Sequence, residues 1–260
     1  MNPDTVDRAA YILHTKMPEY QRHLASARRI IEREVCTTAG VAVSFGKDSG
    51  VLLHLCLEVD PCVPVLFCNR GIEGGGEVPE TYPLIERWKA EYSINLHTVR
   101  PRKTLFEIYQ EYENPFSPET SRIMLARVKR AITIEPMERL RKELGLTTLF
   151  MGLRAEENPD TRGKMIRYKG PAFSKVNGVR VVNPLAYWTA RDIWAYTFST
   201  GIPYHPIYDK ETIRSREEIR LSTWAGVAGR AYGRFAELRN NHPELWFELV
   251  ETFKEARWMA

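Results

Sequence analysis

The sequence predicts an α/β fold: a parallel sheet flanked by helices, with a helical C-terminal extension. Four short apolar runs, at residues 40–44, 63–68, 94–99 and 147–151, have the length and composition of buried strands. Segments with apolar residues at helical spacing separate these runs, and such alternation of strand and helix favours parallel pairing. Sheets of this kind bind ligands beyond the carboxyl ends of their strands.

The composition fits a soluble globular protein. The 260 residues can bury one sizeable core with a small second lobe, and 43% of them are hydrophobic and 27% charged. No apolar run is long enough to cross a bilayer, and the first ten residues lack the apolar core of a signal peptide, so we expect a cytoplasmic protein without membrane contact. The net charge of +4 permits nucleic-acid binding without requiring it.

The first element is one or two helices over residues 5–34, with a break at Pro18. Three arginines, Arg28, Arg29 and Arg33, cluster on the second piece. It is either a helical lid with a solvated basic face or a surface for a partner or a second copy of the chain. We therefore divide the chain into an N-terminal helical segment (1–36), a central domain (37–210) and a helical extension (211–260).

The stretch Val41-Ala-Val-Ser-Phe-Gly-Lys-Asp-Ser-Gly50 predicts a strand, a tight loop and a helix over 48–59. Asp48 and Ser49 are good N-cap residues for that helix. The first N–H groups of a helix lack internal partners and lie at the positive end of its dipole, so the loop suits phosphate. Lys47 adds a mobile cation, and the hydroxyls of Ser44 and Ser49 add donors.

The second strand leads into Asn69-Arg70-Gly71 and a glycine-rich turn. After it we expect a helix over 78–92, the strand 94–99 and a helix over 103–113. Residues 121–144 interleave basic and apolar residues, which predicts an amphipathic helix pair. Its charged face is either solvated or binds nucleic acid or a phosphate-bearing substrate.

The fourth strand ends in Gly152-Leu153-Arg154, where a glycine permits close approach to the backbone. Asn177-Gly178 predicts a hairpin within the basic stretch 164–182, either a flap over the site or a solvated hairpin. Thr189 should cap the next helix in a near capping box with Asp192. Helices near 211–221, from about 228 to 240, and from His242-Pro243 onward follow, with Arg230 and Tyr232 on the middle one.

The four cysteines, at positions 36, 56, 62 and 68, form no CxxC pair. Their spacing is poor for a metal or an iron–sulfur cluster, so we expect buried or incidental thiols in a reducing compartment.

The loop Ser44-Phe-Gly-Lys-Asp-Ser49 resembles SGGKDS, the signature of the PP-loop ATP pyrophosphatases, with Phe45 replacing the first glycine. Pro79-Glu-Thr-Tyr82, the Gly152-Leu-Arg154 segment with Asn158 in place of a serine, and the block 183–209 resemble the PAPS reductase family, so the resemblance spans about residues 38–210. It implies an adenine nucleotide α-hydrolase-like fold that holds the β- and γ-phosphates of ATP with Mg²⁺ and cleaves between α and β. The Asn69-Arg70-Gly71 turn departs from that family's Asp-Thr-Gly type.

The resemblance assigns roles residue by residue. Lys47, Arg154 and Ser44 would be catalytic. The nucleotide would contact Val43, Ser44, Phe45, Gly46, Lys47, Asp48, Ser49, Phe67, Asn69, Gly152 and Arg154. The substrate would contact Arg70, Arg162, Lys164, Arg167 and His205. The neighbours of His205, Tyr204 and Pro206, favour a structural hydrogen bond over a role as proton carrier. No protein residue is assigned as a metal ligand.

PAPS reductases carry a C-terminal cysteine nucleophile, whereas no cysteine follows Cys68 here. The sequence therefore favours an ATP pyrophosphatase that adenylates an acceptor, most like the component of bacterial DNA phosphorothioation systems. DNA, a cysteine desulfurase or another sulfur-transfer protein, and a second copy of the chain would be its partners. One alternative is an ATP sulfurylase-type catalytic subunit that acts on sulfate. The other is a catalytically silent nucleotide- or DNA-binding module.

Overall fold

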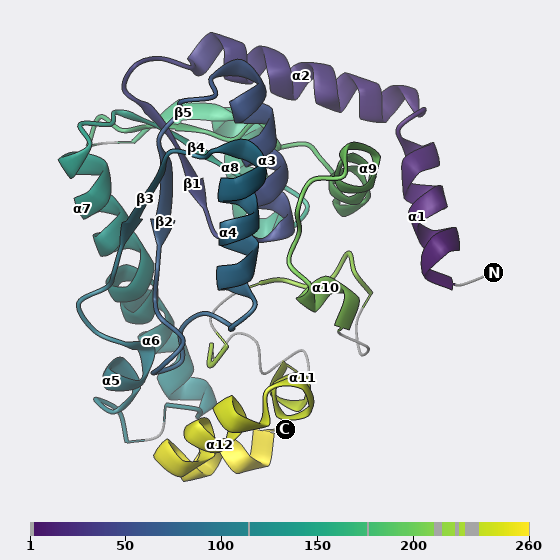
Figure 1. Ribbon diagram of the computed structural model, residues 1–260. Coiled ribbons are helices and arrows are strands. Elements are labelled where there is room, and N and C mark those ends of the chain that lie inside the picture. Colours follow the sequence, from purple (N-terminus) through teal and green to yellow (C-terminus); the bar gives the residue numbers. More distant parts are fainter. Residues whose placement is uncertain are drawn as a thin grey trace. The chain divides into compact units, whose positions relative to one another are not determined.

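The computed structural model describes residues 3–113, 115–175, 177–210, 215–221, 224–226 and 234–259 (Figure 1). The elements follow one another as α1 (Pro3–His14), α2 (Pro18–Glu34), β1 (Ala39–Val43), α3 (Lys47–Val59), β2 (Val65–Cys68), α4 (Thr81–Tyr92), β3 (Leu96–Val99), α5 (Leu105–Tyr109), α6 (Pro118–Lys129), η1 (Arg130–Ile134), α7 (Glu135–Glu143), β4 (Thr148–Met151), η2 (Pro159–Gly163), α8 (Lys164–Lys169), β5 (Ala172–Ser174), β6 (Arg180–Val182), α9 (Ala190–Thr200), α10 (Ile207–Lys210), α11 (Arg234–Asn241), α12 (Pro243–Thr252) and η4 (Lys254–Met259).

The six strands form one sheet in the order β3-β2-β1-β4-β6-β5. β1 lies parallel to β2 and to β4, β4 lies parallel to β6, and only the edge strand β5 is antiparallel to its neighbour. The chain moves outward in one direction from β1 to β2 and β3, and in the other direction from β4 to β6. The strand order therefore reverses between β1 and β4, and ligands of open α/β sheets bind beyond the carboxyl ends of the strands at such a point.

The chain divides into two compact units. The first comprises Met1–Phe67, Tyr82–His97 and Arg141–Pro206. Within it, α3 contacts β1 and β4, α2 and α9 pack against α3, and α1 packs against α9 (Figure 1). Its core is built from side chains of these elements, with Leu52, Val41 and Trp188 almost fully buried. The continuous apolar composition of β1 follows from this burial on both faces of the sheet.

The second unit comprises Cys68–Thr81, Thr98–Leu140 and Ile207–Ala260. It has its own core, in which the rings of Phe106 and Phe253 meet edge-on with centroids 5.1 Å apart and Phe106 meets Trp224 at 5.4 Å. Edge-to-face aromatic pairs of this kind add to the stabilisation that burial provides. The predicted segment boundaries at 36/37 and 210/211 stay predictions.

Most predicted elements are confirmed. The four predicted strands are present as β1, β2, β3 and β4, and Asn177-Gly178 connects the antiparallel pair β5 and β6. Pro18 occupies the first turn of α2, and Pro243 occupies the first turn of α12. Thr189 and Asp192 form a complete capping box at the start of α9. The sequence signals at these positions are local, which is why they predict so well.

Other predicted details are wrong. Gly46 flanks the start of α3, so Asp48 and Ser49 lie inside the first turn and do not cap the helix. The helix expected over 78–92 begins only at Thr81, and the one expected over 103–113 is the five-residue α5. The expected helix pair over 121–144 is a continuous helical run in which the π-helical turn η1 separates α6 from α7.

The C-terminal helices agree only in part with expectation. Residues 215–221 contain a turn and no helix, and 211–214 lie outside the described residues. Of the helix expected over 228–240, the described part is α11, while Arg230 and Tyr232 fall outside the described residues. No helix in the described ranges is long and apolar enough to span a bilayer.

Candidate functional site

The loop between β1 and α3 closes on itself through its two serines. The backbone N–H of Ser44 donates to Oγ of Ser49 at 3.2 Å, and that hydroxyl donates to the carbonyl of Gly46 at 3.1 Å. α3 begins directly after Gly46, so the N–H groups of its first turn and the positive end of its dipole face the loop. The loop emerges from β1, at the point where the strand order reverses.

Phe45 holds this loop in an unusual backbone conformation. Its φ is +54°, in the left-handed region that favours glycine. The ring is 2% exposed and meets the ring of Phe67 at a centroid distance of 5.2 Å. Burial of the ring therefore offsets a backbone cost of roughly 1–2 kcal/mol. The motif has glycine at this position because the backbone is left-handed there. Phe45 adopts the same backbone conformation, and burial of its ring compensates for the cost.

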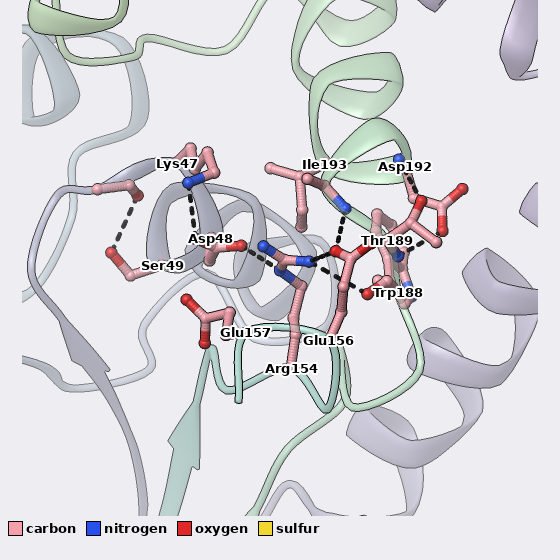
Figure 2. A network of polar contacts seen from close by, with 12 residues as sticks. Lys47, Asp48, Ser49, Arg154, Glu156, Glu157, Trp188, Thr189, Asp192 and Ile193 are labelled. Carbon is pink, nitrogen blue, oxygen red and sulfur yellow. Dashed lines mark hydrogen bonds and ion pairs between the residues drawn. The ribbon is translucent and has the colours of Figure 1, made fainter. Parts of the chain in front are cut away.

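Lys47 lies buried at the start of α3. The residue is 4% exposed, and its Nζ is 3.7 Å from Oδ2 of Asp48 (Figure 2). A buried ammonium group is costly unless anionic partners surround it. The first turn of α3 thus holds a desolvated cation beside its own open N–H groups, which is a strong arrangement for an anion such as phosphate.

Arg154, which follows β4, is brought against the same turn of α3. Its Nε donates to Oδ1 of Asp48 at 2.5 Å, and its Nη1 donates to Oε2 of Glu156 and to the carbonyl of Trp188, the latter at 3.4 Å (Figure 2). The residue is only 2% exposed. Burial disfavours its charge, but the carboxylates of Asp48 and Glu156 outweigh that effect and raise the pKa of Arg154 above the usual arginine value.

Glu156 extends this network to α9. Its Oε2 also accepts the backbone N–H of Ala190 at 2.7 Å, which places a negative charge at the amino end of that helix. Within the first turn of that helix, Asp192 accepts the N–H of Thr189 and contacts both His14 and His23 at 2.8 and 2.9 Å. A continuous set of polar contacts therefore joins α3, the segment after β4, α9, α1 and α2.

Gly152 is required at its position because the first turn of α3 packs closely against it. A Cβ built on it would lie 3.1 Å from the carbonyl carbon and oxygen of Asp48 and 3.2 Å from the backbone nitrogen of Ser49. The close approach that this glycine permits is therefore made by the first turn of α3 itself. It fixes the distance between β4 and the loop that joins β1 to α3.

The structure brings Ser44, Gly46, Lys47, Asp48, Ser49, Gly152 and Arg154 together around the loop, and Phe45 lies in the same loop with its ring buried. Val43 and Phe67 are buried core residues of the first unit. Asn69 and Arg70 belong to the second unit, where Asn69 Oδ1 accepts the N–H of Gly71 and Arg70 Nε donates to Glu77 at 2.5 Å.

The predicted substrate residues near β4 differ in exposure. Arg162 forms an ion pair with Glu157, and Lys164 lies 3.7 Å from Asp160. Arg167 is exposed, whereas His205 is completely buried. Contact between substrate and any of these residues stays a prediction. Sequence reasoning assigned no role to Glu156, although an acidic residue two positions after a buried arginine was a usable signal.

Residues 38–232, which are three quarters of the chain, match the model of the phosphoadenosine phosphosulfate (PAPS) reductase domain family. The chain belongs to the PAPS reductase domain family. Within this family it is 32% identical over 184 residues to the phosphoadenosine 5'-phosphosulfate reductase of Photobacterium profundum, covering 71% of this chain and 68% of the relative. It is 30% identical over 172 residues to that of Xanthomonas campestris pv. campestris (strain B100), where the match covers 66% of each. The chain thus matches just under two thirds of the Xanthomonas protein's length.

Two solved structures share the fold of this chain. The PAPS reductase of Candida auris superimposes with a TM-score of 0.55 at 18% identity, covering 77% of this chain and 89% of that one. The FMN adenylyltransferase of Candida glabrata gives 0.54 at 15% identity, covering 80% and 66%. These likenesses establish the PP-loop type of fold for this member of the PAPS reductase family.

The family's chemistry raises the question of a metal. Among the described residues, no group of three or more His, Cys, Asp or Glu side chains could hold a metal ion. Asp48, the carboxylate nearest the loop, is shared between Lys47 and Arg154. An Mg²⁺ ion would therefore be held chiefly by nucleotide phosphates, as is usual for this ion.

The cysteines have no mutual bonds in the described structure. Cys56 and Cys68 are buried, and burial raises the pKa of both thiols, that of Cys68 to about 11. A thiol with a raised pKa is a poor nucleophile at neutral pH. Cys36 and Cys62 are exposed.

Proposed function

We propose that this protein is an ATP pyrophosphatase that cleaves ATP between the α- and β-phosphates and adenylates an acceptor for sulfur incorporation. The observation that carries the proposal is the pairing of a buried lysine in the first turn of α3 with a buried arginine from the end of β4. Two desolvated cations beside a helix amino terminus suit a polyphosphate better than a singly charged ligand.

The residues of the loop have separable roles in this reaction. The N–H groups of the first turn and Lys47 bind the β- and γ-phosphates. Arg154 stabilises the negative charge that builds up as the α–β bond breaks, and the Ser44 hydroxyl, which is exposed, donates to a phosphate oxygen. Mg²⁺ supplies further neutralisation of the phosphate charge when bound. Positioning and electrostatics suffice, so no covalent enzyme intermediate is required.

The acceptor that we propose is the DNA backbone, as in phosphorothioate modification. Exposed cations near β5, namely Arg167, Lys169 and Lys175, are compatible with a phosphodiester ligand. Sulfur would come from a partner such as a cysteine desulfurase. The buried thiols of Cys56 and Cys68 have raised pKa values. The hydrogen bond with Thr38 lowers the pKa of the exposed Cys36 thiol, but Cys36 lies before the amino end of β1, away from the loop. The protein would work in the cytoplasm. The exposed apolar side chains of Leu13 and Met17 would serve a homodimer.

A second candidate is a sulfonucleotide reductase, which the names of the sequence relatives favour. A reductase would bind PAPS in the same loop and would need a reactive thiol. Among the described residues, the exposed thiol of Cys36 contacts Thr38 and Thr148 at the amino ends of β1 and β4, whereas the loop follows the carboxyl end of β1. This separation ranks the reductase second.

The test follows the products of α-labelled ATP and Mg²⁺, with and without DNA, beside an assay of sulfite release from PAPS with a thiol reductant. We expect AMP and pyrophosphate, loss of both in Lys47→Ala and in the closer-sized Lys47→Met, and full activity in Lys89→Ala, which removes an exposed lysine of α4. ADP and phosphate would refute cleavage between α and β. Sulfite release would establish the reductase instead.

A further inference from the structure

A hollow of about 700 Å³ lies on the outer face of α2, in the first unit and apart from the loop. Two small residues, Ala25 and Ser26, line it together with Arg22 and Arg29. The spacing explains its shape, because residues 22, 25, 26 and 29 lie on one side of a helix. Tyr187, from the segment before α9, forms a wall. The hollow is open to solvent over most of its surface, so it suits an extended ligand that lies across α2.

The two arginines are available to a ligand. Both are exposed, and neither forms an ion pair in the part of the chain that the structure describes. In contrast, the neighbouring Arg28 pairs with Glu58 and Arg33 pairs with Glu34. Arg22 and Arg29 are seven residues apart, which is about 10 Å along a helix. Arginine forks bind phosphate oxygens with two parallel hydrogen bonds.

Tyr187 adds an aromatic surface to the same hollow. It is 51% exposed, and no hydrogen bond or ring contact to it exists among the described residues. A half-exposed ring beside arginines is the combination that proteins use to stack an unpaired base and hold its phosphates. An acidic protein segment would use the arginines but would gain little from the ring.

We propose that this hollow binds a single-stranded nucleic-acid segment, with Arg22 and Arg29 on phosphates and Tyr187 stacked on a base. The proposal rests on the proposed function insofar as it names the surface that would hold the DNA acceptor. His23, which also lines the hollow, contacts Asp192 and thus joins α2 to the polar contacts that hold α9 and Glu156. The bound strand would therefore lie on an element tied to the phosphate-binding loop.

The experiment measures binding of a fluorescent twelve-nucleotide oligo(dT) to the full chain over a range of salt concentrations, without ATP. The double variant Arg22→Gln/Arg29→Gln should bind at least tenfold more weakly and lower the slope of log K against log salt by about 1.4, since each phosphate contact to a single strand contributes about 0.7. Tyr187→Ala should weaken binding about tenfold, within the range for one stacked base, and leave the slope unchanged.

The matched control is Arg87→Gln/Lys89→Gln, which removes the same charge from two exposed residues of α4. It should leave the affinity within twofold of the parent. An equal loss of oligo(dT) affinity in the control and test variants would overturn the proposal, and so would unchanged affinity of Tyr187→Ala. Tighter binding of duplex DNA than of oligo(dT), or displacement of oligo(dT) by polyglutamate at equal charge concentration, would overturn it as well.

Pyrophosphate release from ATP alone, measured on the same variants, separates the two proposals. The α2 variants should retain this basal activity because none of their residues belongs to the loop. Binding without pyrophosphate release would refute the proposed function and leave the nucleic-acid surface standing. Pyrophosphate release without binding would do the reverse.

Discussion

Replacing Phe45 by alanine and by glycine tests whether the phosphate-binding loop carries backbone strain. Both variants lose the buried ring and its contact with Phe67, which should lower the free energy of unfolding by roughly 3 kcal/mol or more. They differ in the backbone. At a φ of +54°, alanine keeps a cost of about 1–2 kcal/mol, whereas glycine avoids it but loses about 0.5–1 kcal/mol more conformational entropy on folding.

The two terms make Phe45→Gly more stable than Phe45→Ala by about 0.75 kcal/mol, in a range of roughly 0–1.5 kcal/mol. Urea unfolding followed by tryptophan fluorescence and circular dichroism measures this difference. The matched control is Leu53, a fully buried residue inside α3, where alanine should exceed glycine in stability by about 1 kcal/mol. The glycine variant should therefore be the more stable one at position 45, and the alanine variant the more stable one at position 53. An alanine variant at position 45 as stable as the glycine variant would refute the strain argument.

Three further outcomes are expected from the network around Arg154. Asp48→Asn removes one of the two carboxylates that contact the buried guanidinium and should cost about 3 kcal/mol in urea unfolding. The double variant Asp48→Asn/Arg154→Gln should cost less than the sum of the single variants, and additive costs would exclude coupling. Gly152→Ala forces a Cβ against the backbone of α3 and should lower stability by about 1–3 kcal/mol, together with pyrophosphate release; an unchanged variant would show that the loop can move aside. For Asp192, burial raises the pKa, but the N–H of Thr189 and the contacts of His14 and His23 together lower it below the usual aspartate value. The carboxylate therefore contributes stability above about pH 4, and this contribution is lost as the pH falls through the lowered pKa. Asp192→Asn should show a smaller loss of stability between about pH 6 and pH 3 than the parent chain.

The sequence predicted the parts of the site that depend on local chemistry. A short apolar strand followed by Ser44-Phe-Gly-Lys-Asp-Ser49 was enough to place the loop at the start of a helix. The capping box of Thr189 and Asp192 was equally accessible because both partners lie within one turn. The position of the cap on α3 was wrong because it depends on the left-handed backbone of Phe45, which side-chain preferences did not indicate.

Contacts between distant parts of the chain were not predictable in this way. Arg154 meets Asp48 across 106 residues, and His14 and His23 meet Asp192 across more than 160. Such pairs are fixed by the strand order, in which β4 enters the sheet beside β1, and periodicity within one segment carries no information about that order. For the same reason, the hollow on α2 depends on Tyr187, which lies far from α2 in sequence.

For the ATP cleavage that we propose, the carboxylate of Asp48 has a consequence for turnover. It contacts both Lys47 and Arg154, so these two cations already share one internal anion. A polyphosphate that reaches them exchanges partners with a carboxylate, and the cations never face a low-dielectric surrounding alone. The binding free energy is then the difference between the free energies of two ion pairs, and this difference is smaller than the free energy of either pair. When pyrophosphate leaves, the same carboxylate can take back the cations, so the loop favours release of the product as well as binding of the substrate.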